Sequence, residues 1–265
     1  MKKSNFLEGA FIATSAIILT KILGVIYVIP FYSIIGEQGG ALYGYSYTIY
    51  NFFLSLSTVG FPLAISKLTS EYNTLGMNAE KVRLYKISKI FILIFSLICF
   101  LICFIFAPQV ANLIIGNIEN GNTIEDVSFT IRMVSFALLV IPLLSIMRGY
   151  LQGHKYIKEP SLSQVIEQVV RVIVILLGSY LTLKVFHLSL RTTIGVAVFA
   201  SCAGGIFAYI YLTVIMKKNK DKLLPKENKV SKIKDKEIIK NKENSIPGAP
   251  WGAVKGMKVV KWVGK

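Results

Sequence analysis

Long apolar runs separated by short polar connections dominate this chain. Six of them approach or exceed the roughly 20 residues that a helix needs to cross a hydrocarbon core about 30 Å thick. The runs cover residues 6–35, 41–68, 87–106, 127–151, 160–186 and 192–216. The pattern predicts an all-α integral membrane protein with six transmembrane helices.

The first run is longer than one bilayer crossing requires. A straight helix over residues 6–35 would measure about 45 Å at 1.5 Å per residue, so we expect it to tilt or break. Glycine and proline are the usual weak points of a helix. Gly24 and Pro30 are therefore predicted breaks or hinges in the first run, as are Pro62 in the second and Pro142 in the fourth.

Connections rich in basic residues alternate along the chain with connections that are acidic or neutral. Segment 67–89 and loop 152–159 are rich in lysine or arginine, whereas connections 36–40 and 107–127 contain neither. Lysine and arginine accumulate in cytoplasmic connections, so we expect both termini in the cytoplasm. The connection from 184 to 191 departs from this rule, because it is short and mildly basic on the predicted outer side.

Composition supports a membrane protein and limits the function classes. The chain is 54% hydrophobic with a mean hydropathy of +0.59 and a net charge of +16. Half of its 30 lysines and arginines follow Met216. We therefore expect a six-helix lobe over residues 1–216 and a lysine-rich, disordered cytoplasmic tail over 217–265. This distribution is typical of membrane flanks and argues against nucleic acid as a partner.

Neither an enzyme nor a metal protein is indicated. The three cysteines, Cys99, Cys103 and Cys202, all lie in apolar runs, and the two histidines, His154 and His187, lie in predicted loops. No catalytic or nucleotide-binding motif is present. We expect no cofactor and no metal.

Ionisable residues at membrane depth are the strongest functional signal, because such groups are costly there and usually face a bundle interior or a wet cavity. Lys21 lies near the middle of the first run. Glu167 and Arg171 stand at i, i+4 in the fifth run, where they can pair along one helix face. A purely structural ion pair remains an equal alternative.

Basic residues outnumber the single acid in the spans, which favours an anion-binding cavity. The candidate ligands of an anionic head group are Lys21, Arg171, Arg148 and Arg132, although the last two lie near helix ends and could be interfacial anchors. Glu167 is the candidate for charge pairing or coupling. The predicted polar lining comprises Asn51, Gln164 and Gln168, with an interhelical hydrogen bond as the simpler role for Asn51.

Two stretches carry a resemblance to a known family. Residues 20–72, which begin TKILGVIYVIPFYSIIGEQGG, and residues 148–172, RGYLQGHKYIKEPSLSQVIEQVVRV, resemble the stage V sporulation protein B and YtgP group. That group belongs to the multidrug/oligosaccharidyl-lipid/polysaccharide exporter superfamily, which also includes lipid II flippases. Lys21 matches a basic position of the family's first helix. A second family arginine is missing, since Tyr27 and Val28 occupy its places.

The resemblance implies two six-helix lobes that move a lipid-linked oligosaccharide across the bacterial inner membrane by alternating access, for peptidoglycan or spore cortex. This chain matches the N-terminal lobe alone. A separate second lobe or a homodimer partner would then complete the transporter. The alternatives are a truncated, non-transporting membrane relic or interaction protein and a cation-coupled drug exporter.

Overall fold

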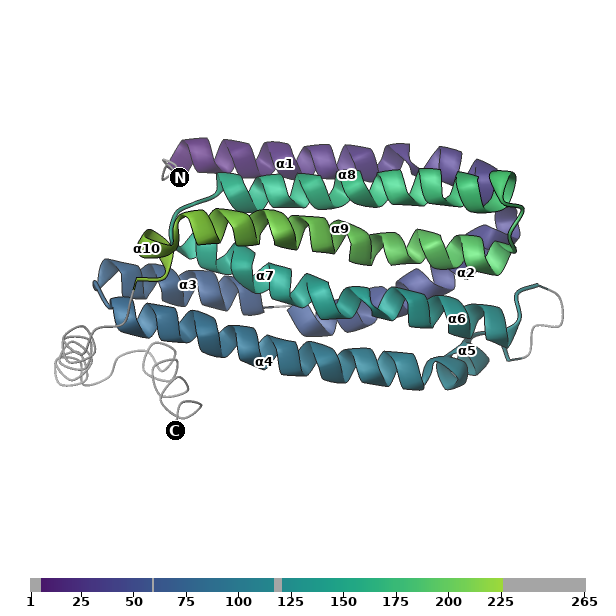
Figure 1. Ribbon diagram of the computed structural model, residues 1–265, viewed down its shortest axis with the longest axis horizontal. Coiled ribbons are helices and arrows are strands. Elements are labelled where there is room, and N and C mark those ends of the chain that lie inside the picture. The colour runs from purple at the N-terminus through teal and green to yellow at the C-terminus, as the bar shows by residue number, and fades with distance from the viewer. Residues whose placement is uncertain (1–5, 59, 117–120, 226–265) are drawn as a thin grey trace.

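The computed structural model describes residues 6–58, 60–116 and 121–225, and the regular structure in these ranges is helical (Figure 1). The elements are α1 (Phe6–Ile26), α2 (Val28–Thr58), α3 (Phe61–Thr74), α4 (Asn78–Ile105), α5 (Ala107–Ile115), α6 (Ile124–Ser135), α7 (Ala137–Gly153), α8 (Lys158–Tyr180), the π-helical turn η1 (Leu181–Val185), α9 (Leu190–Lys218) and α10 (Lys220–Leu223). Six described segments are long and apolar enough to cross a membrane. The predicted all-α membrane architecture is confirmed.

The first membrane crossing breaks one turn before Pro30. Helix α1 ends at Ile26 and α2 begins at Val28, with Tyr27 between them. Proline has no N–H and its ring crowds the carbonyl four residues earlier, which here is the carbonyl of Ile26. Gly24 lies inside α1, where its α-carbon faces the amide nitrogen of Gln168.

Two further irregularities separate the first crossings. Gly36 has a φ of 68° inside α2 and marks a kink between two helical parts, so the chain turns there toward the second crossing. Gly60 has a φ of 84° immediately before α3, and Pro62 occupies the first turn of that helix. In the fourth crossing α6 gives way to α7 at Phe136, whereas Pro142 lies inside α7.

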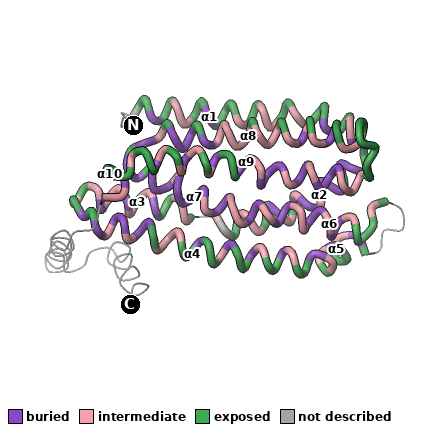
Figure 2. The backbone as a smooth tube through the Cα atoms, viewed as in Figure 1, coloured by how far each residue is buried: buried purple, intermediate pink, exposed green. Residues whose placement is uncertain are grey.

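The helices run side by side in an elongated bundle (Figure 1). The start of α1, the α3–α4 and α7–α8 connections and α10 share one end, while α5 and the α8–α9 connection lie at the other. Helix α8 packs between α1 and α9, and α7 packs against α3, α4 and α9. Helices α7 and α9 contribute many of the buried residues, whereas α1 is mostly exposed or half-buried (Figure 2).

Small residues set the closest helix crossings. A Cβ on Gly204 of α9 would lie 2.5 Å from the carbonyl oxygen of Glu167 on α8, so the backbones of α8 and α9 approach closely at this point. On α7, Gly149 faces the backbone of Pro62, and Gly153 faces the carbonyl oxygen of Ser66. A small-xxx-small spacing of this kind lets helix backbones approach closely in membranes.

The ordered lobe continues past the expected boundary at residue 216. Helix α9 reaches Lys218, and the Tyr150 hydroxyl donates a hydrogen bond to the carbonyl of Leu223, whose side chain is fully buried. The beginning of the lysine-rich segment therefore packs on α7. The expected disorder of the remaining tail concerns residues 226–265, which lie outside the described part of the chain.

Candidate functional site

One carboxylate joins two arginines between α7 and α8. The Arg148 guanidinium donates to Oε2 of Glu167 at 2.8 Å, and the Arg171 guanidinium donates to Oε1 of the same carboxylate. The three side chains are 12–14% exposed. The predicted Glu167–Arg171 pair therefore exists, and Arg148 joins it from the neighbouring helix to form what we call the Arg148–Glu167–Arg171 cluster.

Local packing fixes Arg148. Its Nε donates to the Ser163 hydroxyl at 2.8 Å, and that hydroxyl donates in turn to the carbonyl of Pro160 at 2.6 Å. Gly204 brings α9 against both the backbone and the side chain of Glu167. Ser163 of α8 thus holds Arg148 in place, while the α9 crossing packs against Glu167.

Arg171 extends the cluster toward α2. Its guanidinium donates to Oε1 of Gln168 at 3.0 Å, and its Nε is buried without a hydrogen-bond partner. Three tyrosines of α2 lie close enough to interact with it electrostatically: Tyr43, Tyr47 and Tyr50. A buried donor without a partner is costly, so Arg171 retains capacity for a further acceptor.

The α2 tyrosines form an aromatic face. The rings of Tyr43 and Tyr47 stack with centroids 5.4 Å apart, and Tyr50 follows at 5.4 Å from Tyr47. Positions 43, 47 and 50 recur at helical spacing, so they share a face of α2. That spacing was the signal available in the sequence, and Tyr43, Tyr47 and Tyr50 were missed as candidate site residues.

The cluster carries a net positive charge. Two guanidinium groups surround a single carboxylate at low exposure, and charges count for more where water is scarce. Guanidinium groups bind phosphate or carboxylate oxygens through paired hydrogen bonds. The arrangement can therefore bind an anionic group while Glu167 limits the repulsion between its two arginines.

The other sequence candidates lie apart from this cluster. Lys21 on α1 and Asn51 on α2 are exposed, and Gln164 is half-buried one turn before Gln168 on α8. Within the described residues, no hydrogen bond or ion pair joins any of these three to Glu167. Gln168 is the one predicted polar residue that the structure connects to the cluster.

Arg132 belongs to a different contact. Its Nε donates to the carbonyl of Phe104 at 3.3 Å, and its guanidinium lies 5.6 Å from the centroid of the Phe104 ring. These contacts tie α6 to the end of α4. They give Arg132 a packing role in the described structure and do not bring it to Arg171.

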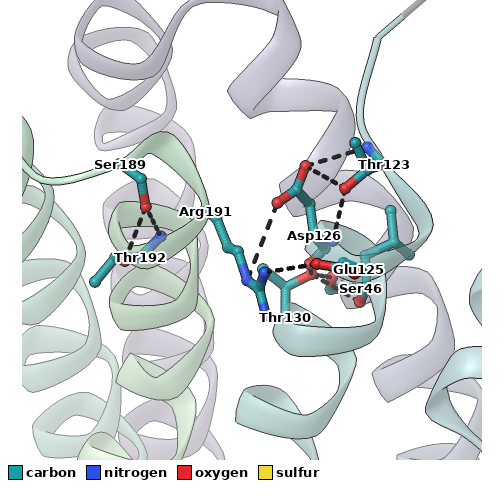
Figure 3. Close-up of polar contacts among 9 residues, drawn as sticks. Ser46, Thr123, Glu125, Asp126, Thr130, Ser189, Arg191 and Thr192 are labelled. Carbon is teal, nitrogen blue, oxygen red and sulfur yellow. Dashed lines mark hydrogen bonds and ion pairs between the residues drawn. The ribbon is translucent and has the colours of Figure 1, made fainter.

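A second group of charges lies where the starts of α6 and α9 meet (Figure 3). Arg191, at the start of α9, pairs with Glu125 at 3.6 Å and Asp126 at 4.0 Å, both on α6. Its guanidinium also lies 4.7 Å from the centroid of the Phe129 ring. Arg191 belongs to connection 184–191, which departed from the predicted alternation of basic and neutral connections. Its charge is compensated by acidic residues of α6.

No metal site accompanies either charge group in the described ranges, which contain no cluster of three or more His, Cys, Asp or Glu side chains suited to a metal ion. The free cysteines Cys99, Cys103 and Cys202 are buried. The site in the described residues consists of two arginine guanidinium groups, one carboxylate, the amide of Gln168 and the tyrosine rings of α2.

Comparisons with known proteins agree with this architecture. Residues 6–241 match the family model described as "Polysaccharide biosynthesis protein". The chain is 40% identical to the lipid II flippase MurJ of Bacillus subtilis over 83% of its own length and 41% of that protein. It is 27% identical to stage V sporulation protein B of the same organism, over 83% of this chain and 40% of that protein.

A solved structure shows the same fold. A MOP superfamily transporter from Pyrococcus furiosus superposes with a TM-score of 0.62 at 13% identity, covering 88% of this chain and 51% of the transporter. The chain thus spans about two fifths of the curated relatives and about half of the solved transporter.

Proposed function

Because the chain belongs to the polysaccharide biosynthesis protein family, we propose that it forms one lobe of a transporter for a lipid-linked oligosaccharide in the bacterial plasma membrane. The cargo would be a precursor of peptidoglycan or spore cortex, in keeping with the names of the similar flippase and sporulation protein. The chain would act by moving its cargo and not as an enzyme.

The Arg148–Glu167–Arg171 cluster is the observation that carries this proposal. A pyrophosphate-linked head group is anionic, and the cluster has one cation in excess of its carboxylate. The unpartnered Nε of Arg171 offers a donor to such a group. A cation-coupled drug exporter is the disfavoured alternative, because basic rather than acidic residues dominate the spans.

Glu167 has two roles in this proposal. It holds Arg148 and Arg171 through different oxygens, so both arginines stay oriented in the absence of cargo. When an anion binds Arg171, the carboxylate can keep its bond to Arg148. Glu167 is also the group through which a proton or a cation would couple to transport.

Lys21 contributes from α1. Its ammonium is exposed and forms no ion pair within the described residues, so it is available to a ligand or to a facing lobe. We propose that it contacts the anionic head group together with Arg171. Asn51, also exposed on α2, would line the same polar path.

The charges at the two ends of the bundle support an orientation in the membrane. The start of α1, loop 154–157 and α10 lie at one end of the bundle (Figure 1), together with most described lysines. We propose that this end faces the cytoplasm, with both termini inside. The cargo would then enter from the cytoplasmic end, next to loop 152–159, and reach the Arg148–Glu167–Arg171 cluster along α8.

A complete transporter requires a second lobe. Transporters of this kind alternate access by rocking one repeat against another around a central site. The partner would be a separate second lobe or a second copy of this chain. A membrane interaction protein that binds lipid but does not transport it is the alternative.

Proteoliposomes test the proposal and separate these cases. The purified chain is reconstituted with a fluorescent polyprenyl-pyrophosphoryl disaccharide, and a membrane-impermeant quencher measures how fast inner-leaflet head groups become accessible. Transport by the chain alone indicates a homodimer, and transport only with an added second lobe indicates a heteromeric transporter. Binding without transport in either case indicates the interaction protein. Absence of both binding and transport would refute the proposal.

A further inference from the structure

A groove runs along the α1–α8 seam on the outer side of the bundle. Its walls are the apolar faces of Phe11, Ile12 and Leu19 on α1 and of Leu162 and Val165 on α8. The groove has a volume of about 270 Å³. Figure 1 shows α1 and α8 lying side by side from the same end of the bundle.

Small side chains open this groove. Ser15 and Ala16 of α1 and Ser161 of α8 line it between the larger apolar residues. The Ser161 hydroxyl donates to the carbonyl of Ile157 at 2.9 Å, so its hydrogen-bonding need is met inside α8. From the level of Phe11 to that of Leu19 the groove is about 12 Å long at 1.5 Å per residue.

A single cation stands at one end of the groove. Lys158, the first residue of α8, lines it and is exposed. Lys158 forms no ion pair within the described ranges of the chain. The neighbouring carboxylate, Glu159, is buried and does not line the groove.

The combination matches the shape of a phospholipid. An apolar channel that leads inward from a lysine at the membrane surface can hold an acyl chain, while the ammonium meets a phosphate. We propose that the α1–α8 groove is a binding site for one anionic phospholipid of the surrounding bilayer, with an acyl chain between Ala16 and Leu162 and the head group on Lys158. This site is separate from the Arg148–Glu167–Arg171 cluster and does not depend on its function.

Charge complementarity favours an anionic lipid over a zwitterionic one. A lysine near the surface of an anionic membrane contributes about 1 kcal/mol, which corresponds to an enrichment of about fivefold. An acyl chain alone would give no preference between head groups. The proposal therefore predicts that the preference for an anionic head group depends on Lys158. It also predicts that retention of any lipid depends on the shape of the groove.

Native mass spectrometry of the chain released from nanodiscs of equal phosphatidylglycerol and phosphatidylcholine tests both parts. We expect one retained phosphatidylglycerol, enriched about fivefold. Lys158→Gln should remove the enrichment, whereas Lys155→Gln, a matched change in the preceding α7–α8 connection and outside the groove, should keep it. Ala16→Leu, or Ser15→Leu if the first variant fails to fold, should reduce retained lipid of both kinds.

Four results would overturn the proposal, three of them with the variants. Lys158→Gln could keep the enrichment, Lys155→Gln could lose it equally, or the groove-filling variants could retain as much lipid as the original chain. Displacement of the retained phosphatidylglycerol by a polyprenyl pyrophosphate at low concentration would also contradict it, because the groove would then hold the tail of a transported lipid.

Discussion

The Arg148 guanidinium of α7 and the Glu167 carboxylate of α8 are joined by a 2.8 Å ion pair at low exposure. The second carboxylate oxygen binds Arg171 one turn along α8. One acid thus compensates two cations from two helices. The stability of the α7–α8 packing and the capacity for an anion depend on the same side chain.

Glu167→Gln is expected to destabilise the lobe. The amide keeps the shape but leaves the guanidinium groups of Arg148 and Arg171 without a counter-charge, and breaking a buried pair in this way costs about 3–5 kcal/mol. Thermal unfolding in detergent should show a clear loss of stability. Glu125→Gln is the matched control, because Glu125 is 85% exposed and surface pairs contribute about 0–1 kcal/mol. Equal effects of the two substitutions would contradict the assigned role of Glu167.

Gly204→Ala is expected to disturb the α8–α9 crossing. The new Cβ would lie 2.5 Å from the carbonyl oxygen of Glu167, and overpacking typically costs about 1–3 kcal/mol. Gly44→Ala in α2 is the control, since a Cβ there meets nothing within 4 Å and alanine favours a helix by up to about 1 kcal/mol. Unfolding measurements should give opposite signs for the two variants. A Gly204→Ala protein as stable as Gly44→Ala would exclude the close crossing.

Single cysteines test the membrane orientation. In a background where Cys99, Cys103 and Cys202 are replaced by serine, Lys155→Cys should react with an impermeant maleimide only after the cells are opened. Leu188→Cys should react in intact cells, because Leu188 belongs to the α8–α9 connection, which lies at the opposite end of the bundle (Figure 1). The reverse labelling pattern would show that the lobe has the other orientation.

The pairing of Glu167 with Arg171 was predictable because it is local. Glu167 and Arg171 are four positions apart on one helix, and this spacing alone brings their side chains together on the same face. Arg148 was harder to place, because its 2.8 Å contact with Glu167 depends on how α7 crosses α8. Near the end of a predicted span, an arginine can equally anchor at the interface. Arg132, which has the same sequence signal, packs on Phe104 instead.

Helix breaks show the same division between local and tertiary causes. The missing N–H of Pro30 accounts for the break at Tyr27, which a sequence can anticipate. The turn at Gly36 requires a φ of 68°, and glycine makes that conformation possible without dictating it. The Gly149 and Gly153 pair against α3 was visible as a spacing, but its partner helix was not.

The most direct test of whether the Arg148–Glu167–Arg171 cluster binds an anionic head group is to measure the affinity of the lobe for a pyrophosphate lipid. Binding of a polyprenyl-pyrophosphoryl disaccharide would be measured in nanodiscs of zwitterionic lipid, for the original chain, Arg171→Gln and the control Arg132→Gln. A hydrogen bond to a charged group contributes about 1.5–3 kcal/mol, so Arg171→Gln should weaken binding at least about tenfold while Arg132→Gln leaves it unchanged. Equal affinities for the original chain and Arg171→Gln would contradict the assignment of the head-group site.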